Sequence, residues 1–404
     1  MFRTSWSIPA YRWMWLHSLF GTMGVISLVI ARGWLVLELT DSPFWVGFTG
    51  GLRGITQIAL GTFSGVLLDR INRRHALLVV DIGNALLAFG MGILILSGKV
   101  ELWHILLATA IEGMFMSVRW PAINTMVYQI AGSERILNAS AAQMLGFNLG
   151  KIVASAIAGV LIATYGVGNG YLFAVGCILL SVASVWIVQG EFRSNTEGEP
   201  SEPFRQALQG GLNYIWNSHS LRWLITFGLM MALLGWSYLA MLPVVARDVL
   251  GLDASGLGFL NAAGGIGALV TTSLIASLGN YQNKIRLLLS NAIIVTIGLI
   301  LFALSTSYPL SLILQAILNG ALMGFETTLT ATVLLVTNAK MQGRVQGVYS
   351  LLLGFAWLGG IVLGGIATIS SAPLAIGLAG IAIGLTIAVL WRPVQQIELA
   401  ESSE

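Results

Sequence analysis

The sequence predicts an all-α membrane protein with twelve transmembrane helices in two six-helix bundles. Three observations lead to this prediction: a shortage of charge, twelve long apolar runs, and one polar segment that divides these runs six and six. Only 9% of the 404 residues are charged, whereas 56% are hydrophobic. Soluble domains carry about 25% charged residues. This chain has too few polar groups to cover a surface in water, so we expect most of its surface to face lipid.

Twelve apolar runs are long enough to cross a membrane. A hydrocarbon core about 30 Å thick needs about 20 residues of helix, and backbone groups in lipid must bond within their own segment. The period-two alternation that a membrane barrel needs is absent from these runs. Helices are therefore expected, and the predicted spans are 12–39, 43–68, 75–97, 102–131, 137–165, 169–190, 219–249, 255–278, 285–306, 309–336, 344–369 and 373–391.

The loop charges give the orientation. With the N-terminus inside, the outer side holds only Lys99 and, at a helix end, Arg247. The inner loops and chain ends hold Arg3, Arg12, Arg70, Arg73, Arg74, Arg135, Arg193, Arg205, Arg222, Lys284, Arg286, Lys340, Arg344 and Arg392. Loops rich in lysine and arginine stay in the cytoplasm. We therefore expect a multi-pass protein of the cell (inner) membrane with both termini cytoplasmic.

A polar segment divides the chain in the middle. Residues 191–203 contain two prolines and are typical of a solvated linker. Apolar residues then recur at helical spacing, which predicts a short helix on the inner membrane surface. These apolar residues are Phe204, Leu208, Leu212 and Ile215. The predicted domains are an N-terminal bundle (1–190), a cytoplasmic linker with this helix (191–218), a C-terminal bundle (219–391) and a cytoplasmic tail (392–404).

Small residues recur at four-residue spacing within several spans. Such spacing lets helix backbones approach closely in lipid, and the plainest interpretation is helix packing. The pairs are Gly61/Gly65, Gly146/Gly150, Ser155/Gly159 and Gly360/Gly364.

Ionisable residues inside the spans are the strongest functional signal. Each costs several kcal/mol to place against lipid, so by default it faces a cavity or a partner. Those well away from the inner loops are Arg32, Glu38, Arg53, Glu112, Arg119, Lys151 and Glu326. Basic groups outnumber acidic ones once Glu38, near the outer rim, is set aside. This excess predicts a chamber for an anionic or amphiphilic substrate, bound by Arg32, Arg53, Arg119 and Lys151 with the deeply placed Trp236 and Trp357.

Two alternatives stay open for these charges. Buried ions also pair for structural reasons, for instance Arg119 with Glu112 or Lys151 with Glu326. A buried carboxyl without a close cation takes up a proton near neutral pH, whereas one beside an arginine stays ionised. Glu112 and Glu326 are therefore the candidates for proton coupling.

Other kinds of chemistry find little support in the sequence. Neither G-x-G-x-x-G nor G-x-x-x-x-G-K-[S/T] occurs, so no nucleotide site is predicted. The single Cys177 and the scattered His17, His75, His104 and His219 predict no metal site and no cofactor. The basic residues lie in short loops rather than in a patch, which argues against nucleic acid. An intramembrane enzyme and a sensor are the less supported classes, and we expect a monomer with no catalytic residues.

The run Gly65-Val-Leu-Leu-Asp69-Arg70-Ile-Asn-Arg73-Arg74 concentrates charge between the second and third spans. Basic residues beside a helix end can bond to the terminus of a neighbouring helix. We interpret Gly65, Asp69, Arg70, Arg73 and Arg74 as a conformational gate. The plainer alternative is a signal for orientation alone.

This motif, with twelve spans in two halves, resembles that of the major facilitator superfamily, and the resemblance covers essentially the whole chain. Three further motifs are similar to those of the branch that contains the enterobactin exporter and macrolide-efflux-type carriers. They are Glu38-Leu-Thr-x-Ser-Pro43, Leu250-Gly-x-x-x-x-Gly256-x-Gly258-x-Leu260 and Gly343-Arg344-Val-x-Gly-Val-Tyr349-Ser350.

The resemblance implies alternating access, usually powered by protons, with the gate residues stabilising the outward-facing state. It also implies that the first, fourth, seventh and tenth spans line the cavity, which places Arg32, Glu112, Arg119, Trp236 and Glu326 there. The chain departs from proton antiporters at two places. Thr109 stands where their fourth span has an arginine before Gly113, and Gly150-Lys151 replaces the Gly-Pro pair of their fifth span.

Taken together, these features predict a secondary active transporter that exports a small anionic or amphiphilic organic molecule, siderophore- or drug-like, by proton-coupled alternating access. The alternative within transport is a carrier of lysophospholipids or other lipid-like amphiphiles. The predicted partners are this small molecule and the lipid bilayer.

Overall fold

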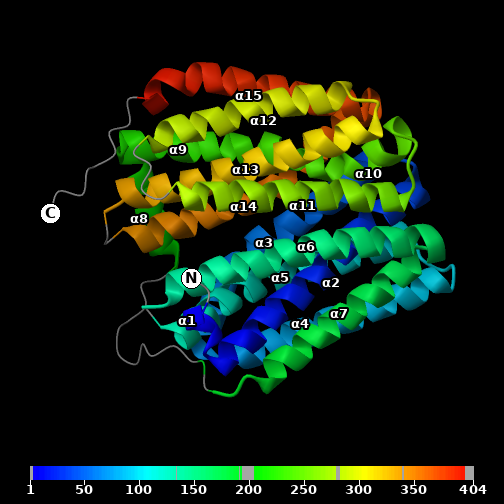
Figure 1. Cartoon of the computed structure of the whole chain (residues 1–404), viewed down its shortest axis with the longest axis horizontal. Helices are drawn as coiled ribbons and strands as arrows, with labels where there is room; N and C mark the ends of the chain where they lie inside the picture. Colours follow the sequence, from blue (N-terminus) through cyan, green and yellow to red (C-terminus); the bar gives the residue numbers. More distant parts are fainter. Residues whose placement is uncertain are drawn as a thin grey trace. The chain divides into compact units, whose positions relative to one another are not determined.

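The computed structural model describes residues 3–132, 134–190, 192, 204–278, 283–338 and 341–395. Inside these ranges, the side chains at 3, 4, 62–67, 69, 70, 137, 204, 205, 207, 350–353 and 392–395 lie outside the described part. Regular secondary structure in the described part is helical throughout (Figure 1). The all-α prediction is confirmed.

Six long helices precede the linker. After the short α1 (Arg3–Trp6) they are α2 (Pro9–Thr40), α3 (Pro43–Arg70), α4 (Arg73–Leu96), α5 (Leu102–Ala131), α6 (Ile136–Tyr165) and α7 (Val167–Ile187). The predicted helix after the linker is α8 (Phe204–Asn217). Its position on a membrane surface stays a prediction.

Six long segments follow α8. The first runs through α9 (His219–Met230), the π-helical η1 (Met231–Trp236), the 3₁₀ turn η2 (Ser237–Met241), α10 (Leu242–Val244) and the π-helical η3 (Val245–Val249). The others are α11 (Ala254–Ser277), α12 (Lys284–Leu304), α13 (Tyr308–Val336), α14 (Gln342–Ile369) and α15 (Ala372–Gln395).

The number of long segments in the described part agrees with the twelve predicted spans. Ten have the length and hydropathy of membrane spans. The other two, α3 and α5, have 28 and 30 residues. At a rise of 1.5 Å per residue these correspond to about 42–45 Å of helix, enough to cross a membrane.

The packing divides the chain into two compact units. Unit 1 comprises Met1–Ser42, Ile55–Glu199 and Ala246–Gly265. Unit 2 comprises Pro43–Gly54, Pro200–Val245 and Ile266–Glu404. The units follow packing, so α3 and α11 are each divided between them. The domain boundaries expected from the linker follow chain connectivity, and they stay predictions.

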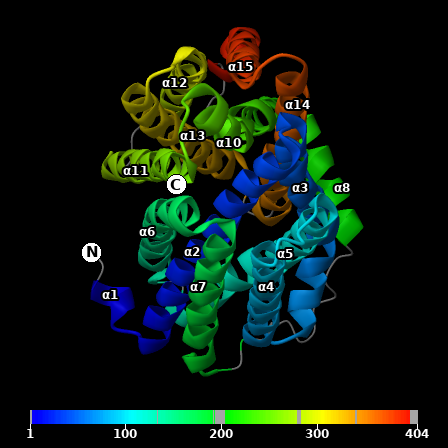
Figure 2. The same cartoon turned by 90° about the vertical axis from the view of Figure 1, so that its right-hand side faces the viewer.

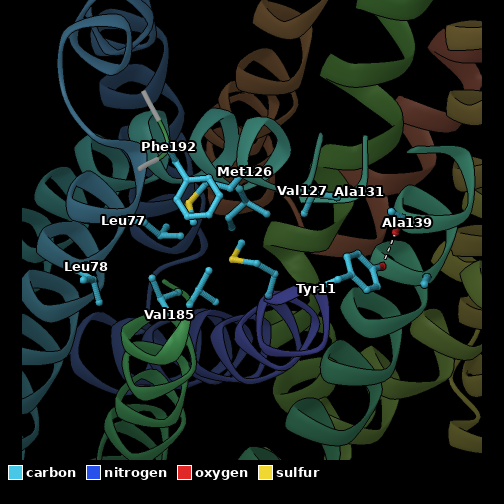
Figure 3. Packing of buried hydrophobic residues seen from close by; sticks show 13 residues of the cluster. Tyr11, Leu77, Leu78, Met126, Val127, Ala131, Ala139, Val185 and Phe192 are labelled. Carbon is cyan, nitrogen blue, oxygen red and sulfur yellow. Dashed lines mark hydrogen bonds between the residues drawn. The ribbon is translucent and has the colours of Figure 1, made fainter. Parts of the chain in front are cut away.

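Unit 1 is organised around α2. This helix packs on both α6 and α7, and α4 packs on α5 and α7 (Figure 2). Because α2 is apolar or small on nearly all sides, it is buried along most of its length. In one part of the core Leu77, Met126, Val185 and Phe192 gather from four parts of the chain (Figure 3). Beside them the hydroxyl of Tyr11 donates a 2.6 Å hydrogen bond to the carbonyl of Ala139, which joins α2 to α6 (Figure 3).

Unit 2 is organised around α12 and α14. Helix α12 packs on α13 and α15, while α14 packs on η1, η2, α8 and α15. The linker helix α8 approaches the start of α14 closely, because Gly211 has no side chain to meet the carbonyl of Arg344. The third branch motif, residues 343–350, therefore lies at the start of α14, the helix on which α8 packs.

Small residues stand at helix crossings in both units, as their spacing predicts. In unit 2, Gly47 of α3 lies against Gly360 of α14. In unit 1, the carbonyl of Ser155 and the backbone of Gly159 on α6 lie against Gly258 of α11. A side chain at Gly47, Gly159 or Gly258 would fill space that backbone atoms occupy. Close backbone packing of this kind holds helices together in lipid, where burial of apolar surface offers no driving force.

The second branch motif forms the start of α11. Gly251 has φ +63°, a left-handed conformation that favours glycine. Asp253 then caps the helix: its Oδ1 accepts from the hydroxyl of Ser255 at 2.5 Å and from the amides of Ser255 and Gly256 at 3.0 and 3.1 Å. The Ser255 hydroxyl, with the two amides, lowers the pKa of Asp253 from its ordinary value. The conformation and the cap together fix the point where α11 begins.

We expect opposite effects from alanine at two glycines of α14. The Cβ of Gly359→Ala would overlap the carbonyl of Leu233, which belongs to a helix backbone and cannot move aside, whereas a Cβ at Gly365 meets nothing within 4 Å. Overpacking at Gly359 should cost about 1–3 kcal/mol. Gly365→Ala should stabilise the helix by about 1 kcal/mol. The measurement is Tm of the purified protein, and two variants that shift Tm in the same direction would contradict the packing at Gly359.

Candidate functional site

Buried ion pairs hold two of the predicted basic residues in unit 1. Arg32 of α2 pairs with Glu112 of α5, and Arg119 of α5 donates from Nε to Oδ1 of Asp81 on α4 at 2.9 Å. The alternative that pairs Arg119 with Glu112 is wrong. Those two residues share a face of α5 but lie seven residues apart, about 10 Å along the axis. Each reaches its partner across a helix interface instead.

Asp81 is the centre of a cluster that the sequence analysis missed. His17 of α2, at 0% exposure, places Nδ1 3.4 Å from Oδ2 of Asp81 and 2.6 Å from the hydroxyl of Ser181 on α7. Asp81 itself is 2% exposed. It was passed over because it lies only seven residues inside its span, and His17 because no second histidine stands at ligand spacing. A charged residue in an otherwise apolar run was the available signal.

A pocket adjoins Arg119 within unit 1. It is lined by Ser18, Thr22, Arg119, Trp120, Ile123, Gln143, Met144 and Phe147. Nη2 of Arg119 and Oε1 of Gln143 are buried without a hydrogen-bond partner among the described residues. Gln143 donates from Nε2 to the hydroxyl of Ser18. Gly21 makes room for the guanidinium, because a Cβ there would overlap Nη2. Two of the residues that line the pocket therefore carry a polar atom without a partner among the described residues, a donor on Arg119 and an acceptor on Gln143.

Unit 2 holds a second pocket, beside Glu326 of α13. The indole Nε1 of Trp236 donates to Glu326 at 3.1 Å, and Tyr349 of α14 is also hydrogen-bonded to the carboxyl. Thr330 in turn donates to the Tyr349 hydroxyl at 3.1 Å. The pocket is lined by Gly228, Met231, Ala232, Trp236, Phe325, Glu326, Leu329, Tyr349 and Ala356. Within the described part of this unit, Glu326 has no ion-pair partner.

The irregular helix of unit 2, which is the segment from α9 through η1 and η2, determines where Trp236 lies. Trp236 closes the π-helical η1 and precedes the 3₁₀ turn η2. A π-helical turn followed by a 3₁₀ turn rotates side chains away from their regular helical positions, and such turns are frequent at functional sites. The sequence analysis placed Trp236 and Glu326 in the pocket as individuals, and the structure brings them into contact.

The remaining predicted residues occupy separate places. Arg53, 4% exposed, places its guanidinium carbon 5.1 Å from the centre of the Trp357 ring, a cation–π contact inside unit 2. Lys151 is half-buried on α6 in unit 1. Glu38 is exposed and accepts from the indole of Trp34 at 2.6 Å, in keeping with its expected place near the rim.

The charged loop motif is described in part. Arg74 donates to the carbonyls of Val185 and Trp186 at 3.3 and 2.6 Å, at the C-terminal end of α7. This is the bond to a neighbouring helix terminus that the sequence analysis expected of the basic residues. Arg73 is 6% exposed, and its amide donates to the carbonyl of Phe192 at 3.0 Å. The side chains of Asp69 and Arg70 and the surroundings of Gly65 lie outside the described part.

The fold defines the class of the protein. It is similar over 96% of the chain to a solved nucleoside transporter, NupG, with a TM-score of 0.70, 14% identity and 100% of that chain covered. A bacterial homologue of the human lysosomal transporter Spinster, inward-facing and occupied, gives a TM-score of 0.75 at 12% identity, with 96% of each chain covered. The helices and these likenesses show the fold of a multi-pass membrane protein, shared with these solved transporters.

Within that class, the chain belongs to the family of transmembrane secretion effectors, which it matches over residues 4–403. It is similar to the enterobactin exporter EntS of Shigella flexneri, with 26% identity over 362 residues, 87% of this chain and 85% of that protein. The enterobactin exporter EntS of Escherichia coli O1:K1 is 24% identical over 361 residues, with the same coverage. This family match confirms the major facilitator superfamily that the sequence motifs led us to expect.

The buried pair between Arg32 and Glu112 should give a large coupling energy. Arg32→Gln or Glu112→Gln alone leaves one buried charge without its partner, which costs about 3–5 kcal/mol. The double variant removes both charges and should recover most of that loss. Tm of the purified proteins measures the cycle. Asp248→Asn, at the half-exposed pair with Arg247, is the control and should cost about 1 kcal/mol or less. Additive losses in the double variant would contradict the pairing.

Proposed function

We propose that the protein is a secondary active transporter that exports a small anionic or amphiphilic organic molecule, siderophore- or drug-like, across the inner membrane. It works by alternating access coupled to protons, as a monomer with both termini in the cytoplasm. The observation that carries the proposal is Arg119. This buried guanidinium lines a pocket, and one of its amino groups has no partner among the described residues. The similarity to proteins named as exporters supports the outward direction.

The basic residues contribute unequally to the proposed anion site. Glu112 neutralises Arg32, so Arg32 serves the site by holding α2 to α5. Arg119 shares its charge with Asp81 but keeps a donor for the pocket. Lys151 supplies further positive charge within unit 1. The proposed binding residues Arg53, Trp236 and Trp357 belong to unit 2, where they supply one cation and two aromatic rings.

The structure favours Glu326 over Glu112 for the proposed proton coupling. Glu112 pairs with Arg32, so a proton on Glu112 would leave that buried cation without its partner. Glu326 is held by uncharged donors, Trp236 and Tyr349, so it can gain a proton without leaving a cation unpaired. The proposed gate is Gly65, Asp69, Arg70, Arg73 and Arg74, supported by the bond of Arg74 to the end of α7.

The lipid-like alternative has one observation in its favour. Apart from Glu326, Trp236 and Tyr349, the pocket of unit 2 is lined by apolar side chains and glycine. Such a lining accepts an acyl chain as readily as the apolar body of a drug-like molecule. A lysophospholipid is therefore included in the transport test below.

Loss of the carboxyl at Glu326 should uncouple transport from protons. Proteoliposomes loaded with enterobactin, an uncharged macrolide or a lysophospholipid measure efflux with and without an imposed proton gradient. We expect the gradient to accelerate efflux by the unaltered protein and by Glu112→Gln, if that variant folds, but not by Glu326→Gln. Glu38→Gln, at the exposed rim, is the matched control. Full acceleration in Glu326→Gln would remove that residue from the coupling role.

Loss of the positive charge at Arg119 should slow the efflux of anions more than the efflux of uncharged compounds. Hydrogen bonds to charged groups contribute about 1.5–3 kcal/mol, so Arg119→Gln should slow anion efflux about 10- to 100-fold at low concentration. Efflux of the uncharged compound should change little. Equal slowing of charged and uncharged compounds would instead indicate a structural role. Preferred efflux of the lysophospholipid by the unaltered protein would favour the alternative function.

A further inference from the structure

The cluster around Asp81 contains two residues, His17 and Ser181, that have no part in the function proposed above. It joins His17, Asp81, Arg119 and Ser181 from α2, α4, α5 and α7, each 5% exposed or less. Ionisable groups so deep in a membrane protein are expensive and mark functional sites by default. Arg119 belongs both to this cluster and to the anion pocket. A change in charge at His17 or Asp81 therefore acts on the pocket through Arg119.

The hydroxyl of Ser181 lets the cluster accommodate His17 in two protonation states. Its oxygen lies 2.6 Å from Nδ1 of His17, 3.1 Å from the carbonyl of His17 and 3.4 Å from Oδ2 of Asp81. When Nδ1 carries no proton, Ser181 can donate to it. When Nδ1 carries a proton, the ring can donate to Ser181 or Asp81, and the hydroxyl turns to the carbonyl. Neither state requires the backbone to move.

The charge balance of the cluster makes proton binding at His17 and anion binding in the pocket favour each other. With neutral His17, the charges of Asp81 and Arg119 cancel, whereas a proton on His17 leaves one positive charge in a buried site. Isolated buried charge is unfavourable, and an anion in the adjoining pocket removes it. The proton also draws Asp81 toward His17, which leaves more of the Arg119 guanidinium available to the pocket.

We propose that His17 and Asp81 form a protonation site separate from Glu326, and that its proton binds together with an anionic group held by Arg119. The inference rests on the anion pocket of the proposed function. It adds a second protonation site, and it states the direction of the coupling there. A bound proton increases the affinity for the anion, and a bound anion increases the affinity for the proton. Because such coupling is reciprocal, lower pH strengthens anion binding and the anion draws in a proton.

The described surroundings of His17 bring no charge to the site beyond Asp81 and Arg119. The described charged groups that act on the ring are Asp81 from α4 and Arg119 from α5. Helix α7 contributes the hydroxyl and carbonyl of Ser181. Helix α6 contributes the amide of Gln143, which bonds to the neighbouring Ser18. The proposed proton is therefore shared between two named residues.

The test is calorimetry of benzenesulfonate binding to the protein in lipid nanodiscs. This anion stays ionised across the working pH range, so every proton gained on binding goes to the protein. Titrations in two buffers with different heats of ionisation give the number of protons taken up per anion. We expect net uptake, up to about one proton, and affinity that rises up to about tenfold per unit fall in pH. Binding without uptake, or no binding to the unaltered protein, overturns the proposal.

Variants assign the proton to the cluster. His17→Gln and His17→Asn, two non-titrating side chains, should bind benzenesulfonate with little or no proton uptake, and Arg119→Gln should lose binding. Glu38→Gln, at the exposed rim, is the control and should keep both binding and uptake. Uptake that survives in both folded His17 variants overturns the proposal. Because binding is read without transport, failure of the export hypothesis would leave this result unchanged.

Discussion

The structure depends on one electrostatic constraint: a charge inside the membrane must be neutralised by another part of the same chain. Lipid offers neither water nor counterions, so an uncompensated arginine costs several kcal/mol. Arg32 and Arg119 meet the constraint with carboxylates on other helices, Glu112 and Asp81. Both pairs involve α5, which is thereby joined to α2 through one pair and to α4 through the other. The charged residues of α5 thus determine which helix faces meet in unit 1.

Glycine makes these electrostatic contacts sterically possible. Gly21 is the clearest case, since a methyl group there would occupy the position of the Arg119 guanidinium. The crossings at Gly47 with Gly360 and at Gly159 with Gly258 follow the same logic for backbone atoms. Helices in lipid are held by close packing and polar contacts rather than by burial of apolar surface. A chain with 48 glycines has many positions where such contact is available.

The parts of the fold that depend on local sequence could be predicted, and the parts that depend on contacts between helices could not. Span positions and α8 follow from apolar runs and helical spacing, which are properties of single segments. The periodicity of α5 correctly placed Glu112 and Arg119 on one face. Their partners belong to other helices, and which helices meet is not a property of one segment. Asp81 was passed over because distance from the loop was taken as the measure of importance.

The irregular helix of unit 2 shows the same limit. Nothing in the run of residues from Met231 to Met241 distinguishes a π turn and a 3₁₀ turn from regular helix, so the contact between Trp236 and Glu326 was not foreseen. The irregular turn packs closely on a neighbouring helix, because Gly359 admits the carbonyl of Leu233 from η1 into close contact with α14. A departure from regular hydrogen bonding is more easily sustained where a neighbouring helix fixes the backbone in this way.

The degree to which each arginine is committed to its carboxylate distinguishes structural from functional charge. A guanidinium has five N–H donors, and a carboxylate that engages only some of them leaves the others for a ligand. Arg119 lines a pocket and bonds to Asp81 through Nε, while its Nη2 has no partner among the described residues. Arg32, which pairs with Glu112, lines neither of the two described pockets. A cation with no carboxylate would be too costly in lipid, and one enclosed by its carboxylate could not bind a substrate. Partial commitment satisfies both demands, and among the arginines of unit 1 that the structure describes within spans, Arg119 meets this condition at a pocket.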